Sequence, residues 1–307
     1  MNSQPLVSIV LPTYNGSRYL RESIESCIAQ TYARWELIIV DDKSTDSTPT
    51  IAEEYARRDT RIRVIRHKVN RKLPGALNTG FRATKGDLLT WTSDDNAYEP
   101  EALEVMIGHL TAHADVDFVN CDVKLIDEHG NFLKLRNLQP PAHPHDVACL
   151  GACFLYRRHV YEALGDYAED MFLAEDFEYW LRARNRYRVD FLADKSPYRY
   201  REHGAALSSR KAEVQLQIAR ARAKHTSDQR AAKRILEEGL QVASWHFRQG
   251  GNYKRALACA ARAVATNPIS YRSWRTLVAS IVAGCAQAIT GSFNGSRERT
   301  AVSVSEV

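Results

Sequence analysis

The sequence predicts an α/β fold with a mainly parallel central sheet, followed by a C-terminal α-helical region. Short apolar runs of strand length alternate with amphipathic helical segments along the first hundred residues. This alternation predicts parallel strands that are joined by right-handed crossovers. From about residue 209 onward, apolar residues recur at helical spacing. We therefore expect one α/β domain and a separate helical region.

The spacing of apolar residues also predicts where each element lies. The first strand is closed by Pro12, which cannot continue a central ladder, and the second is apolar throughout its centre, as a buried parallel strand is. The expected strands cover 6–11, 36–40, 62–65, 88–93, 116–119 and 151–156, and the expected helices cover 18–30, 51–56, 76–84, 102–110 and 157–165. A turn is expected at 127–131, and the proline-rich segment 140–144 is the predicted linker between the two halves of the domain.

Composition places the chain among ordinary globular proteins, since 44% of its 307 residues are hydrophobic and 26% are charged. Its six cysteines include no Cys-x-x-Cys pair, which predicts reduced, buried thiols in a cytosolic setting. No signal peptide precedes the first strand and no stretch reaches the length of a membrane span. We therefore expect a cytoplasmic protein.

The net charge of +5 is distributed unevenly along the chain. Residues 1–203 hold 26 Lys and Arg against 31 Asp and Glu, whereas residues 204–307 hold 16 against 6. The basic second part indicates an anionic partner, such as the inner face of a membrane or an acidic glycan, and a solvated helical face explains it equally well. We expect no nucleic-acid partner.

Two of the predicted strands end in adjacent carboxylates, at Asp41-Asp42 and at Asp94-Asp95. The carboxyl ends of parallel strands form the ligand-binding edge of an α/β sheet, so these side chains should project into a crevice. Carboxylates suit Mg²⁺ or Mn²⁺, which commonly shares its remaining positions with phosphate oxygens. The alternatives are an exposed turn after the fourth strand and a helix cap at Asp42. No glycine-rich phosphate loop follows the first strand, which argues against dinucleotide and P-loop chemistry.

Several motifs then agree in order and spacing with a known family. The segments 7–15, 30–32 and 36–46, with Asn78-x-Gly80 and Lys85-Gly86-Asp87, resemble the nucleotide-binding half of glycosyltransferase family 2, whose fold is known as GT-A. Segment 92–98 is particularly similar to the spore-coat polysaccharide glycosyltransferase of that family. The resemblance covers about residues 5–205 and implies a Rossmann-like sheet with helices on both faces.

This resemblance implies roles for individual residues on the donor side. Pro12 and Tyr14 would line the base pocket, Asp42 would accept a hydrogen bond from the base, taken to be uracil, Arg71 would approach the diphosphate, Asp94 would lie near the ribose hydroxyls, and Asp95 would bind the metal. The metal signature of the family is Asp-x-Asp, and this chain has Ser93 at the first position. His203, in a segment that resembles the one closing over the diphosphate, is a second metal candidate.

Another acidic pair, Glu175-Asp176, begins a predicted amphipathic helix whose apolar face includes Trp180. A helix N-terminus favours the carboxylate form that a base needs to accept the proton of an acceptor hydroxyl. The resemblance makes Asp176 the general base and puts Glu175 and Trp180 on the acceptor side. An ordinary acidic first turn is the alternative.

The helical region, expected over 209–290, contains a tetratricopeptide-like helix pair within 244–268. One such pair cannot bury its own apolar face, so it should dock on the catalytic domain, on neighbouring helices or on another chain, which leaves an oligomer open. The apolar segment 277–289 either completes this packing or lies at a membrane interface. Residues 291–307 are small and polar, which predicts a disordered tail.

Together these observations predict a metal-dependent, inverting glycosyltransferase that uses Mn²⁺ or Mg²⁺. Its GT-A domain would cover 1–208, with the nucleotide-sugar half at about 5–115 and the acceptor half at about 116–208. The expected donor is a UDP-sugar, and the acceptor is a hydroxyl of a glycan or lipid-linked glycan in polysaccharide biosynthesis. One alternative is a non-catalytic nucleotide-binding scaffold that works through its helical tail. A nucleotidyltransferase is weaker, because its phosphate-binding loop after the first strand is missing.

Overall fold

The computed structural model describes residues 4–137, 152–192 and 195–301. The chain divides into two compact units, Met1–Ser209 and Arg210–Val307, each of which is described by itself. The division falls one residue beyond the expected domain end at 208. The predicted linker at 140–144 and Cys149 lie outside the described residues.

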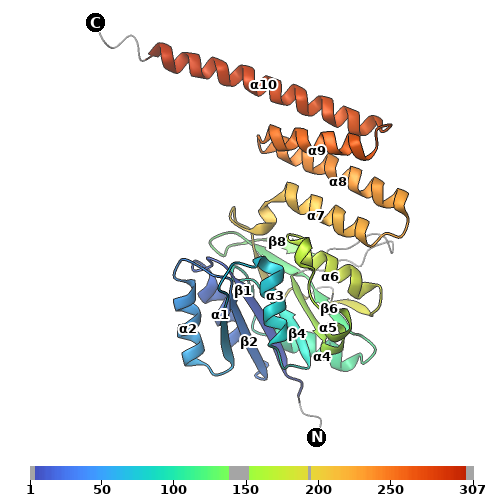
Figure 1. Ribbon diagram of the computed structural model, residues 1–307. Coiled ribbons are helices and arrows are strands. Elements are labelled where there is room, and N and C mark those ends of the chain that lie inside the picture. Colours follow the sequence, from blue (N-terminus) through green and yellow to red (C-terminus); the bar gives the residue numbers. More distant parts are fainter. Residues whose placement is uncertain (1–3, 138–151, 193–194, 302–307) are drawn as a thin grey trace. The chain divides into compact units, whose positions relative to one another are not determined.

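A seven-stranded sheet with the order β10-β6-β9-β4-β1-β2-β3 forms the centre of the first unit (Figure 1). β1 is parallel to both of its neighbours, β2 and β4, and β2 is parallel to β3. β9 runs antiparallel to β4 and β6, so the sheet is mainly parallel with one reversed strand. The strands are β1 (Val7–Thr13), β2 (Trp35–Asp41), β3 (Ile62–Arg66), β4 (Leu88–Trp91), β6 (Phe118–Cys121), β9 (Cys153–Arg157) and β10 (Val189–Leu192).

The first strand is longer than predicted, because β1 continues through Pro12 to Thr13. The amide of Thr92 donates to the carbonyl of Val10, and the amide of Asp42 donates to the carbonyl of Thr13, so alternate residues of β1 face β4 and β2. Pro12 therefore faces the β4 side, where the pairing of β4 with β1 ends at Val10. The proline nitrogen is tolerated because no ladder hydrogen bond is required there.

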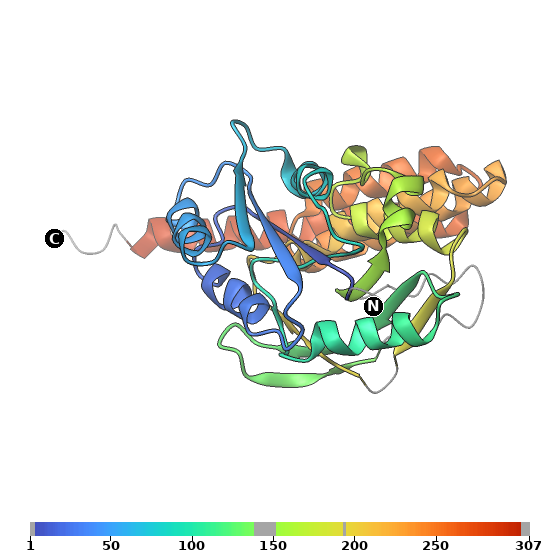
Figure 2. The ribbon, with the colours of Figure 1, turned by 90° about the horizontal axis from the view of Figure 1, so that it is seen from below.

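Helices cover both faces of this sheet, as Figure 2 shows. Ile9 and Leu37 pack in one core with α1, α2 and α4, whereas Val10 and Ile38 pack in a second core with α3, α5 and α6. This burial on both faces explains why the strands are continuous apolar runs in the sequence. The helices are α1 (Leu20–Ile28), α2 (Thr48–Arg58), α3 (Lys72–Arg82), α4 (Ala102–Ala112), α5 (Arg158–Leu164) and α6 (Glu175–Arg184).

A smaller sheet with the order β5-β11-β7-β8 lies beside the end of β4. β5 (Ala97–Tyr98) follows the Asp94-Asp95 loop directly and pairs with β11 (Tyr198–Arg201). β11 is parallel to β7 (Val123–Ile126), which in turn pairs with β8 (Phe132–Arg136). This sheet connects the acidic loop after β4 with the end of β11, two residues before His203.

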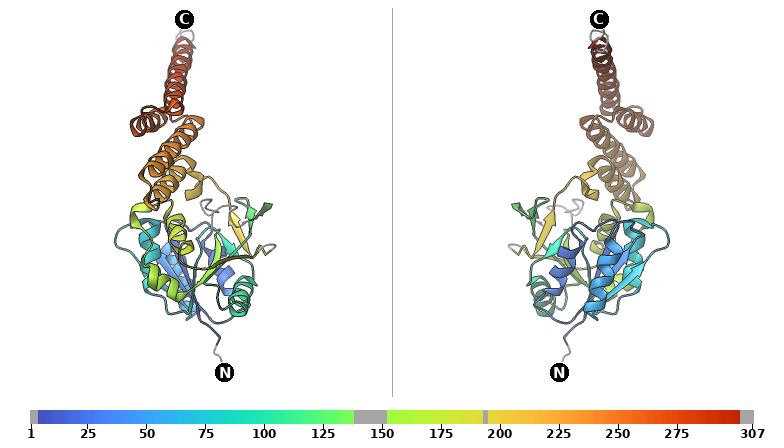
Figure 3. Two further views of the ribbon diagram at one scale, coloured as in Figure 1. Left: turned by 90° about the vertical axis from the view of Figure 1, so that its right-hand side faces the viewer. Right: turned by 90° about the vertical axis from the view of Figure 1, so that its left-hand side faces the viewer.

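The described part of the second unit consists of α7 (Lys211–Lys224), α8 (Gln229–Gln249), α9 (Tyr253–Thr266) and α10 (Tyr271–Ala301). α8 packs on both α7 and α9, and the predicted tetratricopeptide-like pair corresponds to α8 and α9. Small buried residues, including Ala243, Ala256 and Ala260, allow these helices to approach closely. Figure 3 shows α10 as one long helix that continues beyond α8 and α9.

Three features of this unit differ from the expectations. α10 continues through Gly291 to Ala301, where a disordered tail was expected, because a helix that has formed adds one hydrogen bond for each further residue. The apolar segment 277–289 completes the packing only in part, because Leu277 is partly buried and Ser280 is buried, whereas Val278 and Ile281 are exposed. Cys285 is exposed, whereas Cys27, for example, is buried as predicted. No helix within the described residues is long and apolar enough to cross a membrane.

Candidate active site

The carboxyl ends of β1, β2 and β4 meet at one edge of the large sheet, because these strands are parallel neighbours. The Thr13 hydroxyl at the end of β1 donates to Asp94 Oδ2 at 2.5 Å, and the amide of Asp42 donates to the Thr13 carbonyl at 2.9 Å. Tyr14 is half exposed at the same edge, whereas Pro12 is buried within β1. The predicted donor-side acids are therefore brought together around Thr13.

Asp42 is almost fully buried and is held through one carboxylate oxygen. His67 Nδ1 lies 2.7 Å from Asp42 Oδ1, and the backbone amide of Arg71 donates to the same oxygen at 2.7 Å. The other ring nitrogen of His67 lies 2.9 Å from the Thr79 hydroxyl. Asp42 therefore fixes the start of α3 rather than capping α2, and no described residue hydrogen-bonds to its Oδ2. His67 had no signal in the sequence, because it is 25 residues from Asp42 in the chain.

Arg71 precedes α3, and its guanidinium is bound to an acid on the opposite half of the unit. Its Nη2 donates to Glu169 Oε1 at 2.9 Å, and Glu169 begins the short 3₁₀ helix Glu169–Met171. Both side chains remain partly exposed, so this ion pair is weak and can exchange for a better anion. The sequence analysis did not identify Glu169, whose place opposite Arg71 depends on the chain returning over the sheet.

Burial controls the charge of Asp94. Desolvation, helped by the neighbouring Asp95 carboxylate, raises the pKa of Asp94 to about 7. Gly16 lies so close that a Cβ there would be 1.9 Å from Asp94 Oδ2. The loop after β1 therefore requires glycine at this position, and it shields Asp94 from water.

Asp95 and His203 form the best candidate for a metal site. His203 Nε2 lies 3.0 Å from Asp95 Oδ2, and Asp95 Oδ1 is buried with no hydrogen-bond partner among the described residues. A buried carboxylate oxygen without a partner is costly unless a ligand or ion satisfies it. Within the described chain no group of three or more His, Cys, Asp and Glu could hold a metal by itself. The residues fit a Mg²⁺ or Mn²⁺ ion that takes its other ligands from a substrate diphosphate.

Arg201 holds the metal-candidate loop in place and was not identified from the sequence. It is 2% exposed, its Nε donates to the Asp95 carbonyl at 3.0 Å, and its amide donates to Asn96 Oδ1 at 2.8 Å. Its charge is balanced by Glu22 on α1. An arginine in the motif Tyr-Arg-Tyr-Arg gives no sequence signal for this role, because its partners lie more than 100 residues away.

The second acidic pair lies at the start of α6, as predicted. Burial and the neighbouring Asp176 raise the pKa of Glu175 to about 8, and burial raises the pKa of Asp176 as well. The helix N-terminus was expected to favour the carboxylate, but desolvation outweighs the backbone hydrogen bond that Phe177 donates to Asp176. Leu173, just before the pair, has a φ of 77°, a strained conformation of the kind found at functional sites.

Tyr200 on β11 lies within electrostatic reach of both acidic groups. Burial raises the pKa of its hydroxyl, and the Asp95 and Asp176 carboxylates each raise that pKa further. Asp95 comes from the first half of the unit and Asp176 from the second, so the charges of both halves act on Tyr200. Tyr200 is a further residue that the sequence did not single out.

Trp180 does not lie on the acceptor side. It is 2% exposed and packs edge-on against Phe118 and Phe154, with ring centroids 4.8 and 4.7 Å apart. The apolar face of α6 is turned toward the sheet, so its aromatic residues fill the core. That part of the prediction was wrong, because a helix that presents acids at its N-terminus uses its apolar face for packing.

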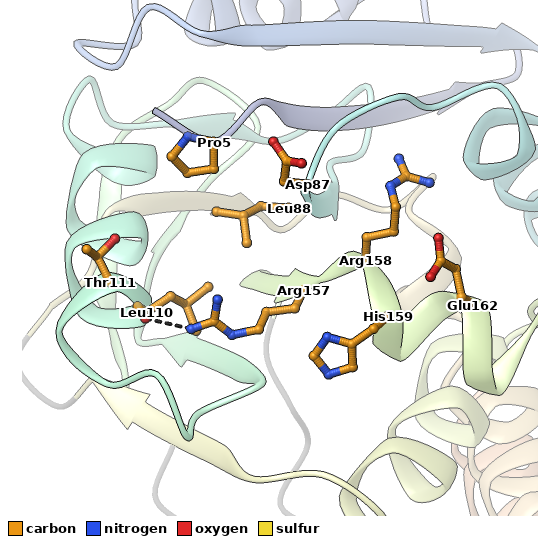
Figure 4. Close-up of a pocket in the computed structure, with 9 residues that line it drawn as sticks. All are labelled: Pro5, Asp87, Leu88, Leu110, Thr111, Arg157, Arg158, His159 and Glu162. Carbon is orange, nitrogen blue, oxygen red and sulfur yellow. Dashed lines mark hydrogen bonds between the residues drawn. The ribbon is translucent and has the colours of Figure 1, made fainter. Parts of the chain in front are cut away.

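The hollow drawn in Figure 4 does not include these acids. It lies at the other edge of the sheet, where β4 begins and β9 ends. Its two arginines already bind backbone carbonyls: Arg157 Nη2 donates to Leu110 at 2.7 Å, and Arg158 Nε donates to Gly86 at 2.5 Å. These hydrogen bonds satisfy backbone carbonyls at the end of α4 and just before β4. The arginines that line the hollow therefore have a structural role.

Fold and site together define a GT-A glycosyltransferase: a mainly parallel sheet with acids at the carboxyl ends of its strands, and a second acidic pair at the start of α6. The sequence model of Glycosyl transferase family 2 matches residues 8–165, about half of the chain. The chain belongs to this family, and it is a glycosyltransferase.

Named relatives agree with this assignment. The chain is 31% identical to the glycosyltransferase EpsE of Bacillus subtilis over 218 residues, which cover 68% of this chain and 78% of EpsE. It is 32% identical to the glycosyltransferase EpsJ of the same organism over 220 residues, which cover 66% of this chain and 63% of EpsJ. Part of each relative therefore has no counterpart in the match.

Solved structures share the fold at lower sequence identity. S. aureus TarS 1–349, crystallised with UDP-GlcNAc, superimposes with a TM-score of 0.61 at 20% identity, over 85% of this chain and 81% of TarS. The mannosyltransferase PcManGT from Pyrobaculum calidifontis, in complex with GDP-Man and Mn²⁺, gives a TM-score of 0.58 at 19% identity, over 94% of this chain and 88% of PcManGT.

Proposed function

We propose that this glycosyltransferase moves a sugar from a UDP-sugar to an acceptor hydroxyl of a glycan or lipid-linked glycan, with inversion at the anomeric carbon. The observation that carries the proposal is the buried Oδ1 of Asp95, which has no hydrogen-bond partner among the described residues and lies beside His203 at the carboxyl edge of the sheet. The nucleotide sugars bound to TarS and PcManGT support a nucleotide-sugar donor. We expect the reaction to occur in the cytoplasm as part of polysaccharide biosynthesis.

On the donor side, Asp42 accepts the imide N–H of uracil through Oδ2, since Oδ1 is already held by His67 and the Arg71 amide. Tyr14 borders the base beside Pro12. Arg71 exchanges Glu169 for the diphosphate, a stronger partner for a guanidinium. Asp94 contacts the ribose hydroxyls, and its pKa near 7 allows it to act as acceptor or donor there.

Asp95 and His203 would hold Mn²⁺ or Mg²⁺ together with diphosphate oxygens, and the ion would stabilise the negative charge of the departing UDP. Two observations support this assignment: the unpartnered, buried Oδ1 of Asp95 and the contact of His203 with Oδ2. Arg201 keeps the Asp95 backbone fixed, so the carboxylate is oriented before substrate arrives.

Asp176 takes the proton of the acceptor hydroxyl as that oxygen attacks the anomeric carbon. The bond from the sugar to UDP breaks with its electron pair going to UDP, and the proton stays on Asp176. A single displacement of this kind inverts the anomeric centre. Glu175, whose pKa of about 8 keeps it protonated at neutral pH, leaves Asp176 as the charged member of the pair.

The test is a panel of UDP- and GDP-sugars, each measured by thermal shift with Mn²⁺ and with EDTA. We expect a UDP-sugar to stabilise the protein only with the metal, in proportion to the logarithm of its concentration above Kd. NMR of the product formed from an α-linked donor should then show a β linkage. A response to GDP-sugars alone would contradict the role of Asp42, and stabilisation unaffected by EDTA would contradict the metal site.

A further inference from the structure

α10 packs on its own unit partly through hydroxyl groups. Ser273 and Ser280 are fully buried. The Ser273 hydroxyl donates to Glu237 Oε1 at 2.7 Å, and the Ser280 hydroxyl lies 3.1 Å from that of Ser244 on α8. Gln241 on α8 also donates to Ser273, at 3.0 Å. The side of α10 that faces the bundle therefore contains buried hydroxyl groups beside the partly buried Leu277.

The apolar residues of α10 lie on its other side and are exposed. They recur every three or four residues, and their exposed fractions lie between 45% and 77%. We call them the outer row: Tyr271, Trp274, Val278, Ile281 and Val282. Ile269, just before the helix, is 94% exposed. A contiguous apolar stripe of this kind marks an interaction surface.

The charge of the residues around the outer row indicates what kind of partner covers it. Residues 239–297 contain no Asp or Glu, whereas they contain seven Lys and Arg. Arg272 and Arg275 lie on α10 beside Tyr271 and Trp274, are exposed, and make no ion pair with any described residue. A second copy of this surface would bring arginines against arginines with no acid to pair with them, since a symmetric dimer uses the same patch twice. An anionic surface matches both the apolar row and the charge.

We propose that the outer row of α10, with Arg272 and Arg275, docks this protein on an anionic phospholipid surface. The aromatic and aliphatic side chains enter the boundary between headgroups and acyl chains, and the arginines meet the lipid phosphates. α10 lies parallel to the surface, which agrees with the absence of a membrane-spanning helix among the described residues. The inference rests on the second unit alone and does not depend on the proposed donor or base.

Flotation of the full chain with vesicles tests the proposal. Vesicles of phosphatidylcholine alone are compared with vesicles that contain about one third phosphatidylglycerol, at about 50 and 500 mM salt. We expect binding to the anionic vesicles at low salt and a steep loss at high salt. Equal binding to both vesicle types, or none to either, overturns the proposal.

Two variants separate the contributions of the outer row and the arginines. Trp274→Ser with Ile281→Ser should abolish flotation, and Arg272→Gln with Arg275→Gln should weaken partitioning by about 25-fold, roughly fivefold for each charge. The matched control, Lys233→Gln with Arg234→Gln, removes the same charge from exposed positions on α8 rather than on α10 and should have a smaller effect. A far-UV circular dichroism spectrum and a thermal melting curve that match those of the parent protein show that each variant is folded.

Light scattering over a range of protein concentrations tests whether a second copy of the chain covers the outer row instead. A dimer that forms without lipid and is lost in Trp274→Ser with Ile281→Ser would overturn the proposal in favour of a second copy. A monomer whose vesicle binding is lost in that variant supports the lipid surface.

Discussion

At the scale of single residues, the site is organised by acids whose neighbours are also acids. In Asp94-Asp95 and in Glu175-Asp176, one member has a pKa raised to about 7 or 8 by burial and by the adjacent carboxylate. Two adjacent buried charges are too costly, so one member of each pair keeps its proton near neutral pH. In the second pair, this leaves Asp176 to accept the proton of the acceptor hydroxyl.

Replacing Asp95 by Asn should remove most of the Mn²⁺-dependent binding of UDP, because it deletes the charge of a candidate metal ligand. Calorimetry with and without Mn²⁺ measures the effect. Asp115→Asn, an exposed acid paired with Arg188, is the matched control and should bind UDP normally. Unchanged Mn²⁺-dependent affinity in the Asp95 variant would remove this residue from the metal site.

Asp176→Asn should lower kcat by about 10²–10⁴-fold and leave donor affinity unchanged, since a positioned base contributes that much. In the unmodified enzyme the base must be deprotonated, so kcat/KM should fall as pH drops through a pKa above the usual range of aspartate, in the direction that burial shifts it. A pH–rate profile measures this limb. A profile that stays flat down to pH 4 would contradict the assignment of a buried base.

Glu175→Gln should change how stability depends on pH. The unfolded pKa is near 4.5 and the folded pKa is about 8, so the folded state retains a proton that the unfolded state loses. The stability from this proton is complete below pH 4.5 and is lost as pH rises through 8. Gln imitates the protonated acid, so the variant should match the parent at pH 5 and melt several degrees higher at pH 9. The exposed Glu162→Gln should show no such difference.

At the scale of elements, α3 positions Arg71 because it lies unusually close to the sheet. A Cβ at Gly80 would be 2.3 Å from Val10 Cγ1 on β1 and 3.2 Å from Val40 Cγ2 on β2. Only glycine permits this approach, even though it lowers helix propensity. The Asn-x-Gly motif of the sequence is therefore a packing requirement of α3.

Gly80→Ala should destabilise the protein by about 1–3 kcal/mol, because the added methyl group overpacks the contact with β1. Gly108 in α4 is the matched control: it is exposed, and a Cβ there would meet nothing within 4 Å. Gly108→Ala should therefore stabilise the protein by roughly 0.5–1 kcal/mol through helix propensity. Urea unfolding measures both. Equal effects in the two variants would contradict the close approach of α3.

At the scale of the whole molecule, the candidate site lies entirely within the first unit, and the outer row of α10 lies in the second. The family assignment sets aside the scaffold and nucleotidyltransferase alternatives, since the chain is a glycosyltransferase. Catalysis and surface attachment can therefore be altered separately.

UDP with Mn²⁺ should slow hydrogen exchange only in the first unit. Ligand at about 100 times Kd stabilises the state that binds it by about 2.7 kcal/mol. This stabilisation slows exchange only in elements that open together with the site. We expect slower exchange in the loops after β1, β2 and β4, with α8 and α9 unchanged. Mass-spectrometric exchange measures this, and equal protection of α8 would show that the two units open as one.

Sequence alone was sufficient to predict the parallel strands, their order in the chain and the acids at their ends. Apolar runs and the carboxylates that follow them are local signals, and a parallel sheet brings such strand ends to one edge. The positions of Asp42, Asp94 and Asp95 at this edge follow from this rule alone. The length of β1 does not, because Pro12 is allowed only where the pairing of β4 with β1 ends.

Tertiary structure alone decided which distant groups meet these acids and which side of each helix is covered. His67, Glu169, Arg201 and Tyr200 reach the site from segments that are remote in sequence, and nothing in their local pattern distinguishes them from surface residues. Spacing showed that α6 and α10 each have an apolar side. The apolar side of α6 faces the core, where Trp180 is buried. Much of the apolar side of α10 stays exposed, because buried serines hold α10 to its bundle. Periodicity defines a face, but only the neighbours present in the fold determine what that face meets.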